Sequence, residues 1–126
     1  MTDMGTFRTT IVIESTQHRG DMRAVEAALV DTGSEFTWVP ASVLEQLGIA
    51  PEMTQRFILA DGRHLERPVG IAIVHAAGRK APDYVVFGEA TDMIILGART
   101  LEGMNVRVDT LRKELVPAGP ILAGAA

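Results

Sequence analysis

Short apolar runs separated by polar turns make up most of the chain. Arg8–Ser15 and Ala24–Val30 are strand-length segments on either side of the polar sequence TQHRGD, and this arrangement predicts a hairpin. A second hairpin is predicted where two strand-like arms flank Asp61-Gly62, because this dipeptide accepts the positive φ angles of a tight turn. The run Val69–Gly88 repeats the pattern around a turn at 77–80. These elements predict a mostly β protein.

One segment, VPASVLEQLGI, has a helical pattern instead. Its apolar side chains recur at helical spacing, Pro40 suits a first helical turn, and Gly48 can adopt the left-handed conformation that ends a helix. The pattern predicts a helix of about two turns.

Further along, the apolar strand Met93–Leu96 leads into Gly97 and a second short helix, followed by a last strand near Asn105–Val108. The final segment, PAGPILAGAA, contains too many small residues and prolines to predict an element. We find no repeat and no linker, and therefore expect one compact domain over residues 1–126, with extreme termini that are either interface strands or disordered.

Composition narrows the classes of protein that fit. The net charge of -4 disfavours a nucleic-acid binder or a protein of anionic membrane surfaces, and the absence of cysteine excludes disulfides and thiolate sites. No apolar run approaches the roughly 20 residues of a membrane-spanning helix. The first segment carries Asp3 and has neither a basic region nor a long apolar region, which is unlike a signal peptide. We therefore expect a cytoplasmic protein.

The sequence ALVDTGS places a carboxylate at the end of an apolar strand. The strand holds the backbone of Asp31, and Gly33 allows the chain to turn sharply enough to bring amides near the carboxylate. Thr32 and Ser34 supply hydroxyl groups for a hydrogen-bond network around it. Taken alone, this sequence is also typical of a surface turn or an Asx cap.

Three elements, in this order and separation, resemble the retropepsins, the retroviral-type aspartic proteases, and especially their cellular single-domain relatives. ALVDTGS is similar to the catalytic loop of that family, ILADGR lies where the family has its flap hairpin, and MIILGARTLEG is similar to its second apolar strand with glycine and helix. The resemblance covers most of the chain. It implies a small acid-protease β-barrel with one or two short helices, in which the catalytic loop and the second apolar strand lie together.

The resemblance also implies a homodimer. Aspartic proteolysis uses two aspartates, and a chain with one Asp-Thr-Gly sequence supplies only Asp31, so the active site would form across a twofold axis. Two nearby carboxylates share one proton, so that one acts as base toward a water and the other as acid toward the peptide carbonyl. No metal, cofactor or covalent intermediate is needed. The substrate would be a peptide or protein segment in extended conformation.

Roles for the neighbouring residues come from the resemblance alone. Thr32 would bond across the dimer axis, Gly33 would offer its carbonyl to the substrate, and Ser34 would support the carboxylate. The flap residues, listed here, would close over the peptide: Ala60, Asp61 and Gly62.

The sequence departs from the family pattern at two places. The family often has arginine directly after the second glycine, where it pairs with an acidic residue near the catalytic loop; here Ala98 occupies that position and Arg99 follows, which leaves the partner of Glu35 open. The flap has a shorter and more polar tip than that of the viral relatives. These departures motivate an alternative function, a retropepsin-fold dimer that binds peptides with weak or no proteolysis; a plain β-rich interaction domain is a third possibility.

Other residues offer no competing chemistry. His18, His64 and His75 lack metal-ligand spacing and are expected at the surface, and the charges around Arg19 are expected to form a solvated turn. Trp38 suits either the core or the wall of a substrate pocket.

Overall fold

The computed structural model describes residues 6–125, and within them the chain is mostly β with two short helices. The strands are β1 (Arg8–Glu14), β2 (Met22–Asp31), β3 (Thr37–Pro40), β4 (Met53–Ile58), β5 (His64–Ala76), β6 (Arg79–Gly88), β7 (Ile95–Gly97), β8 (Val106–Asp109) and β9 (Glu114–Pro117). The helices are α1 (Ala41–Gln46) and α2 (Ala98–Gly103). None of the helices in this part of the chain is long and apolar enough to cross a bilayer.

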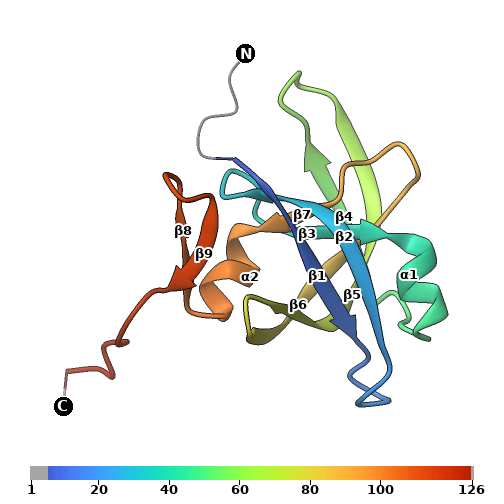
Figure 1. The fold of residues 1–126 in the computed structure, drawn as a ribbon. Coiled ribbons are helices and arrows are strands. Elements are labelled where there is room, and N and C mark those ends of the chain that lie inside the picture. Colours follow the sequence, from blue (N-terminus) through green and yellow to red (C-terminus); the bar gives the residue numbers. More distant parts are fainter. Residues whose placement is uncertain (1–5, 126) are drawn as a thin grey trace.

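Six strands close into a barrel in the order β1-β2-β7-β3-β6-β5, because β1 also pairs with β5 (Figure 1). Inward-facing side chains alternate along the strands, as Ile11 and Ile13 show on β1, and both are fully buried. They pack in one core with Leu44 of α1 and Leu101 of α2, so the two helices are held against the barrel. The predicted fold class, a mostly β barrel with short helices, is confirmed.

Beyond the barrel, β4 pairs only with the first part of β5 and forms a hairpin that projects from the rim. Figure 1 shows its tip at the same end of the molecule as the loop between β6 and β7, whereas the β1–β2 turn lies at the opposite end. A two-stranded ribbon is only marginally stable by itself. The contacts of this hairpin with the barrel therefore determine its position.

The predicted hairpins and helices are confirmed, with differences at their ends. β5 is one strand that serves both the second and the third hairpin, because Gly70 allows close approach to the carbonyl oxygen of Ala50 without interrupting the strand. Gly48 has the expected left-handed conformation, with φ of 69°.

Two elements differ from the sequence-based expectation. Met93 lies in the loop before β7 and is 51% exposed, so the strand expected at Met93–Leu96 begins only at Ile95. β9 was not predicted; it pairs with β8 in a separate hairpin, in which Lys113 adopts a φ of 55° at the turn. Residues 118–125 are exposed and contain no strand, while residues 1–5, including Asp3, lie outside the described residues.

Candidate active site

Asp31 is the last residue of β2 and stands at one end of the barrel. β2 runs parallel to β7, and Asp31 is the register partner of Gly97. The side chain is half-buried, and the backbone N–H of Gly33 donates a hydrogen bond to its Oδ1 at 2.9 Å. The sheet therefore holds the backbone of the carboxylate, and the following turn directs its side chain.

Gly33 is needed here for space. Its φ is not in the left-handed region, so the sharp turn does not depend on glycine, contrary to the sequence-based interpretation. A Cβ at this position would lie 3.2 Å from Oδ1 of Asp31, closer than an ordinary van der Waals contact. Only glycine brings its amide to this carboxylate without crowding it.

The Ser34 hydroxyl group does not bond the carboxylate. The Ser34 Oγ donates to the carbonyl oxygen of Phe36 at 3.0 Å, and the Ser34 amide donates to the backbone carbonyl of Asp31 at 3.2 Å. Ser34 thus stabilises the loop backbone, and its hydroxyl proton is not available to the carboxylate. Thr32 is exposed on this end of the barrel.

The start of α2 closes against the same loop. The Ala98 amide donates to the carbonyl oxygen of Ser34 at 2.7 Å. A Cβ on Gly97 would overlap the carbonyl oxygen of Phe36 and lie 2.9 Å from that of Ser34. Gly97 therefore allows the two chain segments to cross, as the family resemblance implied.

A chain of buried hydrogen bonds runs from this crossing into the barrel wall. The Gly97 amide donates to Thr37 Oγ1 at 3.0 Å, which lies 2.6 Å from Thr100 Oγ1. Thr100 Oγ1 in turn donates to Asp83 Oδ2 at 2.9 Å, so the proton between the two threonines belongs to Thr37. Sequence reasoning missed this relay, because Thr37 and Asp83 lie far in sequence from Gly97 and Thr100 and share no motif with them.

Arg99 takes a different role from the family arginine. Its guanidinium lies over the ring of Phe36, at 5.3 Å from the centroid, and near the ring of Tyr84. Its backbone N–H donates to the carbonyl oxygen of Glu35 at 3.1 Å. Among the ion pairs within residues 6–125, none joins Arg99 to Glu35. The contact between helix and loop is thus made by backbone and aromatic rings.

The β4–β5 hairpin carries the residues that were predicted to form a flap. Its tip is a three-residue loop of Ala60, Asp61 and Gly62, all exposed, in which only the glycine has a positive φ, of 87°. The Leu59 amide donates to the Arg63 carbonyl oxygen at 2.8 Å, a pattern typical of three-residue hairpin loops with glycine in the left-handed position. Close to its tip, the hairpin rests on the barrel through aromatic contacts, with the ring of Phe57 4.8 Å from that of Trp38.

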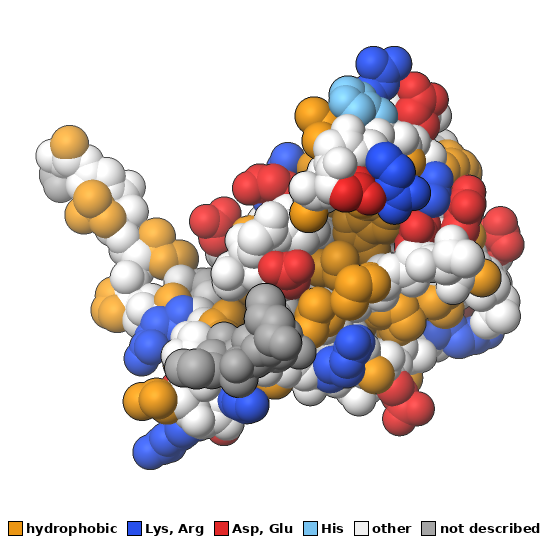
Figure 2. Space-filling model, turned by 90° about the horizontal axis from the view of Figure 1, so that it is seen from above, with side chains coloured by type: hydrophobic (Ala, Val, Ile, Leu, Met, Phe, Trp, Pro, Cys, Tyr) orange, Lys and Arg blue, Asp and Glu red, His pale blue; other side chains and the backbone are white. Residues whose placement is uncertain are grey.

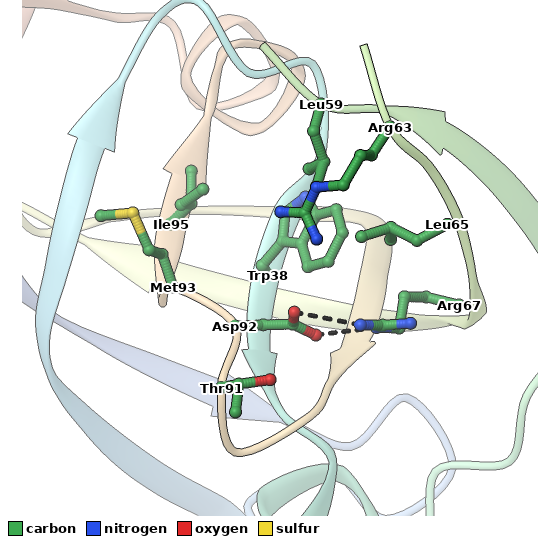
Figure 3. A pocket seen from close by; sticks show the side chains of 9 residues that line it. All are labelled: Trp38, Leu59, Arg63, Leu65, Arg67, Thr91, Asp92, Met93 and Ile95. Atoms are coloured by element: carbon green, nitrogen blue, oxygen red, sulfur yellow. Dashed lines mark hydrogen bonds and ion pairs between the residues drawn. The ribbon is translucent and has the colours of Figure 1, made fainter. Parts of the chain in front are cut away.

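A pocket of about 510 Å³ lies between this hairpin and the loop that precedes β7 (Figure 3). Its lining is Trp38, Leu59, Arg63, Leu65, Arg67, Thr91, Asp92, Met93 and Ile95. Trp38 belongs to the core and to the pocket wall at once, since it is only 8% exposed and packs on Val69 and Val86. The volume is within the range of sites that hold small ligands or side chains.

An ion pair stands inside this pocket. Nε and Nη2 of Arg67 on β5 bond the two carboxylate oxygens of Asp92 at 2.7 and 3.1 Å, and the side chains are only 12% and 13% exposed. The hydrogen bonds from Arg67 lower the pKa of Asp92, and the same bonds raise that of Arg67. The pair links the hairpin to the loop before β7. No local motif revealed it, because 25 positions separate its members.

The pocket and Asp31 belong to one face of the molecule. Ile95 of the pocket wall lies two residues before Gly97, the partner of Asp31, which is about 7 Å along a strand. Figure 2, seen onto this end of the barrel, shows hydrophobic side chains at the bottom of a hollow beside a ridge of charged ones. A peptide laid across Asp31 would therefore meet the pocket within a few residues.

A second charged cluster lies at the opposite end, around Glu14. This residue is 2% exposed, and its carboxylate accepts hydrogen bonds from Arg19 Nε at 2.9 Å and from the Gly20 amide at 2.9 Å, with His75 Nε2 at 2.7 Å. The bond from Arg19, followed by those of His75 and Gly20, lowers the pKa of Glu14 from 4.5 to about 2. The turn around Arg19 is exposed, as predicted, and so are His18 and His64, whereas His75 is half-buried against Glu14.

The sequence was compared with models of protein families and with curated proteins. A family model described as aspartyl protease matches residues 20–100, which include Asp31, the β4–β5 hairpin and Gly97. A comparison with curated proteins finds no match. Because the family model covers more than half of the sequence, the chain belongs to the aspartyl protease family.

Proposed function

We propose that the protein is a homodimeric aspartic endopeptidase that hydrolyses extended peptide segments. Its family supports a protease-type function. The observation that carries the finer proposal is the setting of Asp31, whose carboxylate is directed by the Gly33 amide at the barrel end that holds the pocket and the hairpin. A single chain contributes one such carboxylate, so a second copy is required to complete the pair.

The mechanism follows from the chemistry of paired carboxylates. When two copies bring their Asp31 side chains within a few ångströms, like-charge repulsion prevents both from being ionised, and the pair holds one proton. The ionised carboxylate takes a proton from a bound water as the water oxygen attacks the peptide carbonyl carbon. The protonated carboxyl group of the partner subunit's Asp31 donates a hydrogen bond to the carbonyl oxygen, where negative charge develops. The carboxyl group that took the proton from the water then gives it to the leaving amine as the C–N bond breaks, and the pair is left with one proton.

Thr32 and the flap tip complete this proposal. Thr32 is exposed beside the carboxylate, which suits contact with a second copy. The exposed tip of the β4–β5 hairpin lies beyond the contact of Phe57 with Trp38, so the tip can close over a bound peptide and donate or accept backbone hydrogen bonds.

Cleavage of a peptide library by the wild type and by Asp31→Asn tests the proposal. We expect the wild type to cleave from acidic to near-neutral pH, and Asp31→Asn to lose cleavage while it keeps the dimer and the fold. Asp21→Asn, an exposed carboxylate in the β1–β2 turn, is the matched control and should retain activity. Equal activity of the Asp31 variant would remove Asp31 from the mechanism, and sedimentation showing only monomer at high concentration would contradict the shared site.

The alternative is a peptide-binding dimer with weak or no proteolysis. It is motivated by the departure from the family pattern after Gly97, where no ion pair joins Arg99 to Glu35 within residues 6–125. If the alternative is right, no cleavage appears over a wide pH range. Extended peptides still bind, and binding protects the backbone amides of the hairpin around Asp61 from hydrogen exchange.

A further inference from the structure

Two arginines line the pocket, and they differ in how their donors are used. Arg67 has Nε and Nη2 bonded to Asp92, and its Nη1 donates to the carbonyl oxygen of Glu66 at 2.9 Å. Arg63 has only its Nε bonded, to Asp61 Oδ2 at 2.7 Å, and within residues 6–125 its two terminal nitrogens have no hydrogen-bond partner. Of these two arginines, Arg63 is therefore the one whose terminal N–H groups can donate hydrogen bonds to a ligand.

The free end of Arg63 is aimed by its neighbour. Asp61 accepts the Arg63 backbone N–H on Oδ1 at 3.0 Å and the side-chain Nε on Oδ2, so one carboxylate holds both the backbone and the guanidinium. Figure 3 shows the guanidinium extending over the pocket near Trp38 and Leu59. A side chain held in this way loses less freedom when a ligand binds.

The remaining lining favours an anion with an apolar stem. The carboxylate oxygens of Asp92 accept two hydrogen bonds from Arg67 and one from the Glu89 backbone N–H, at 2.7 Å. Because these bonds occupy and neutralise the carboxylate, Asp92 is a poor partner for a cationic ligand. Trp38 and Leu65 provide apolar walls. The two terminal nitrogens of a guanidinium match the two oxygens of a carboxylate in a bidentate pair.

We infer that Arg63 selects a carboxylate in this pocket, specifically a glutamate side chain of an extended substrate, with its methylene groups against Trp38 and Leu65. The inference rests on the proposed proteolysis and names its substrate class. Arg63 is a specificity-determining residue that binds the substrate away from the scissile bond. A peptide C-terminus carries the same chemical group, and the experiment below separates the two sources.

The test uses peptides with blocked ends in which each position around one cleavage site carries Glu, Gln or Lys. At one position the wild type should cleave the Glu peptide about fivefold better than the Gln peptide in kcat/KM, through KM, and salt should weaken this ratio. Arg63→Gln should bring the ratio to about one, Arg63→Lys should restore part of it, and Arg63→Glu should favour Lys. Arg56→Gln is the control, because Arg56 lies on the same hairpin, is exposed, pairs with Glu66 and does not line the pocket.

The outcomes separate this inference from the proposed function. Cleavage without a Glu preference at any position, or with a preference that Arg63→Gln retains, overturns the role of Arg63 and leaves the protease intact. A preference found only when the peptide C-terminus is a free acid shows capture of the terminus and overturns the side-chain assignment. If no peptide is cleaved, the proposed protease activity is refuted. Binding of the same peptides is then measured by fluorescence anisotropy. Tighter binding of the Glu peptide that is lost in Arg63→Gln supports the role of Arg63, and any other result refutes it.

Discussion

Asp31 and Gly97 are direct partners in the parallel pair of β2 and β7, although they come from opposite halves of the chain. This pairing brings the loop after β2 against the start of α2, where the Ala98 amide bonds the Ser34 carbonyl oxygen. The position of the candidate catalytic carboxylate thus depends on a segment far from it in sequence.

Gly97→Ala should destabilise the fold, because the new Cβ would overlap the Phe36 carbonyl oxygen. We expect a loss of about 3 kcal/mol in the free energy of unfolding, measured with denaturant. Gly48→Ala is the control: its Cβ would meet nothing within 4 Å, so only the left-handed backbone costs energy, about 1 kcal/mol. Equal losses for the two variants would contradict the crossing as described.

Gly33→Ala should lower activity more than stability. Its Cβ would lie 3.2 Å from Asp31 Oδ1 and displace the carboxylate, so we expect kcat to fall roughly tenfold. Denaturant unfolding should change by less than about 1 kcal/mol, since the loop is exposed at this point. Gly78→Ala, in the β5–β6 turn, should show the reverse pattern, with a stability loss and unchanged kcat. Full activity of Gly33→Ala would show that the carboxylate tolerates displacement.

Thr37→Val should cost about 1–3 kcal/mol of unfolding free energy, because it leaves the buried Gly97 amide without an acceptor. Thr100→Val should cost a similar amount. Since the hydroxyl groups are 2.6 Å apart, the double variant should lose less than the sum, and the difference measures their coupling. Thr54→Val, at an exposed position on β4, is the control. Additive losses would show that the relay does not act as a unit.

Stability should decline in acid through Glu14. Its pKa is about 2 in the folded protein against 4.5 for the free side chain, so the unfolded state binds more protons in this range. The contribution of Glu14 is therefore complete above about pH 4.5 and is lost as the pH falls toward 2. Unfolding curves measured from pH 2 to 6 should show a steep decline that is smaller in Glu14→Gln.

Two variants support that measurement. Glu66→Gln, in an exposed pair, should keep the wild-type profile, and Arg19→Gln should flatten it even if Glu14→Gln does not fold. Some decline should remain in every variant, because the pKa values of Asp61 and Asp92 are also lowered from 3.8. A profile unchanged in both Glu14→Gln and Arg19→Gln would assign the acid sensitivity to other carboxylates.

Local pattern alone determined much of the architecture. Alternating apolar residues and turn sequences placed the hairpins, and helical spacing with Gly48 located α1, because these signals arise from neighbours in sequence. The motif at Asp31 and its order with the later elements indicated the family that the comparison shows. The exposed tip of Ala60, Asp61 and Gly62 was likewise visible from its turn residues.

Only the tertiary structure decided which distant groups meet. The Arg67–Asp92 pair, the Thr37–Thr100 relay and the burial of Glu14 with His75 each join segments that carry no common pattern. Strand pairing sets two of these contacts, since the pairing of β1 with β5 brings Glu14 near His75, and the pairing of β3 with β7 brings Thr37 near Thr100. Hydrogen bonds depend on positions within tenths of an ångström, and sequence spacing specifies such positions only within a single element.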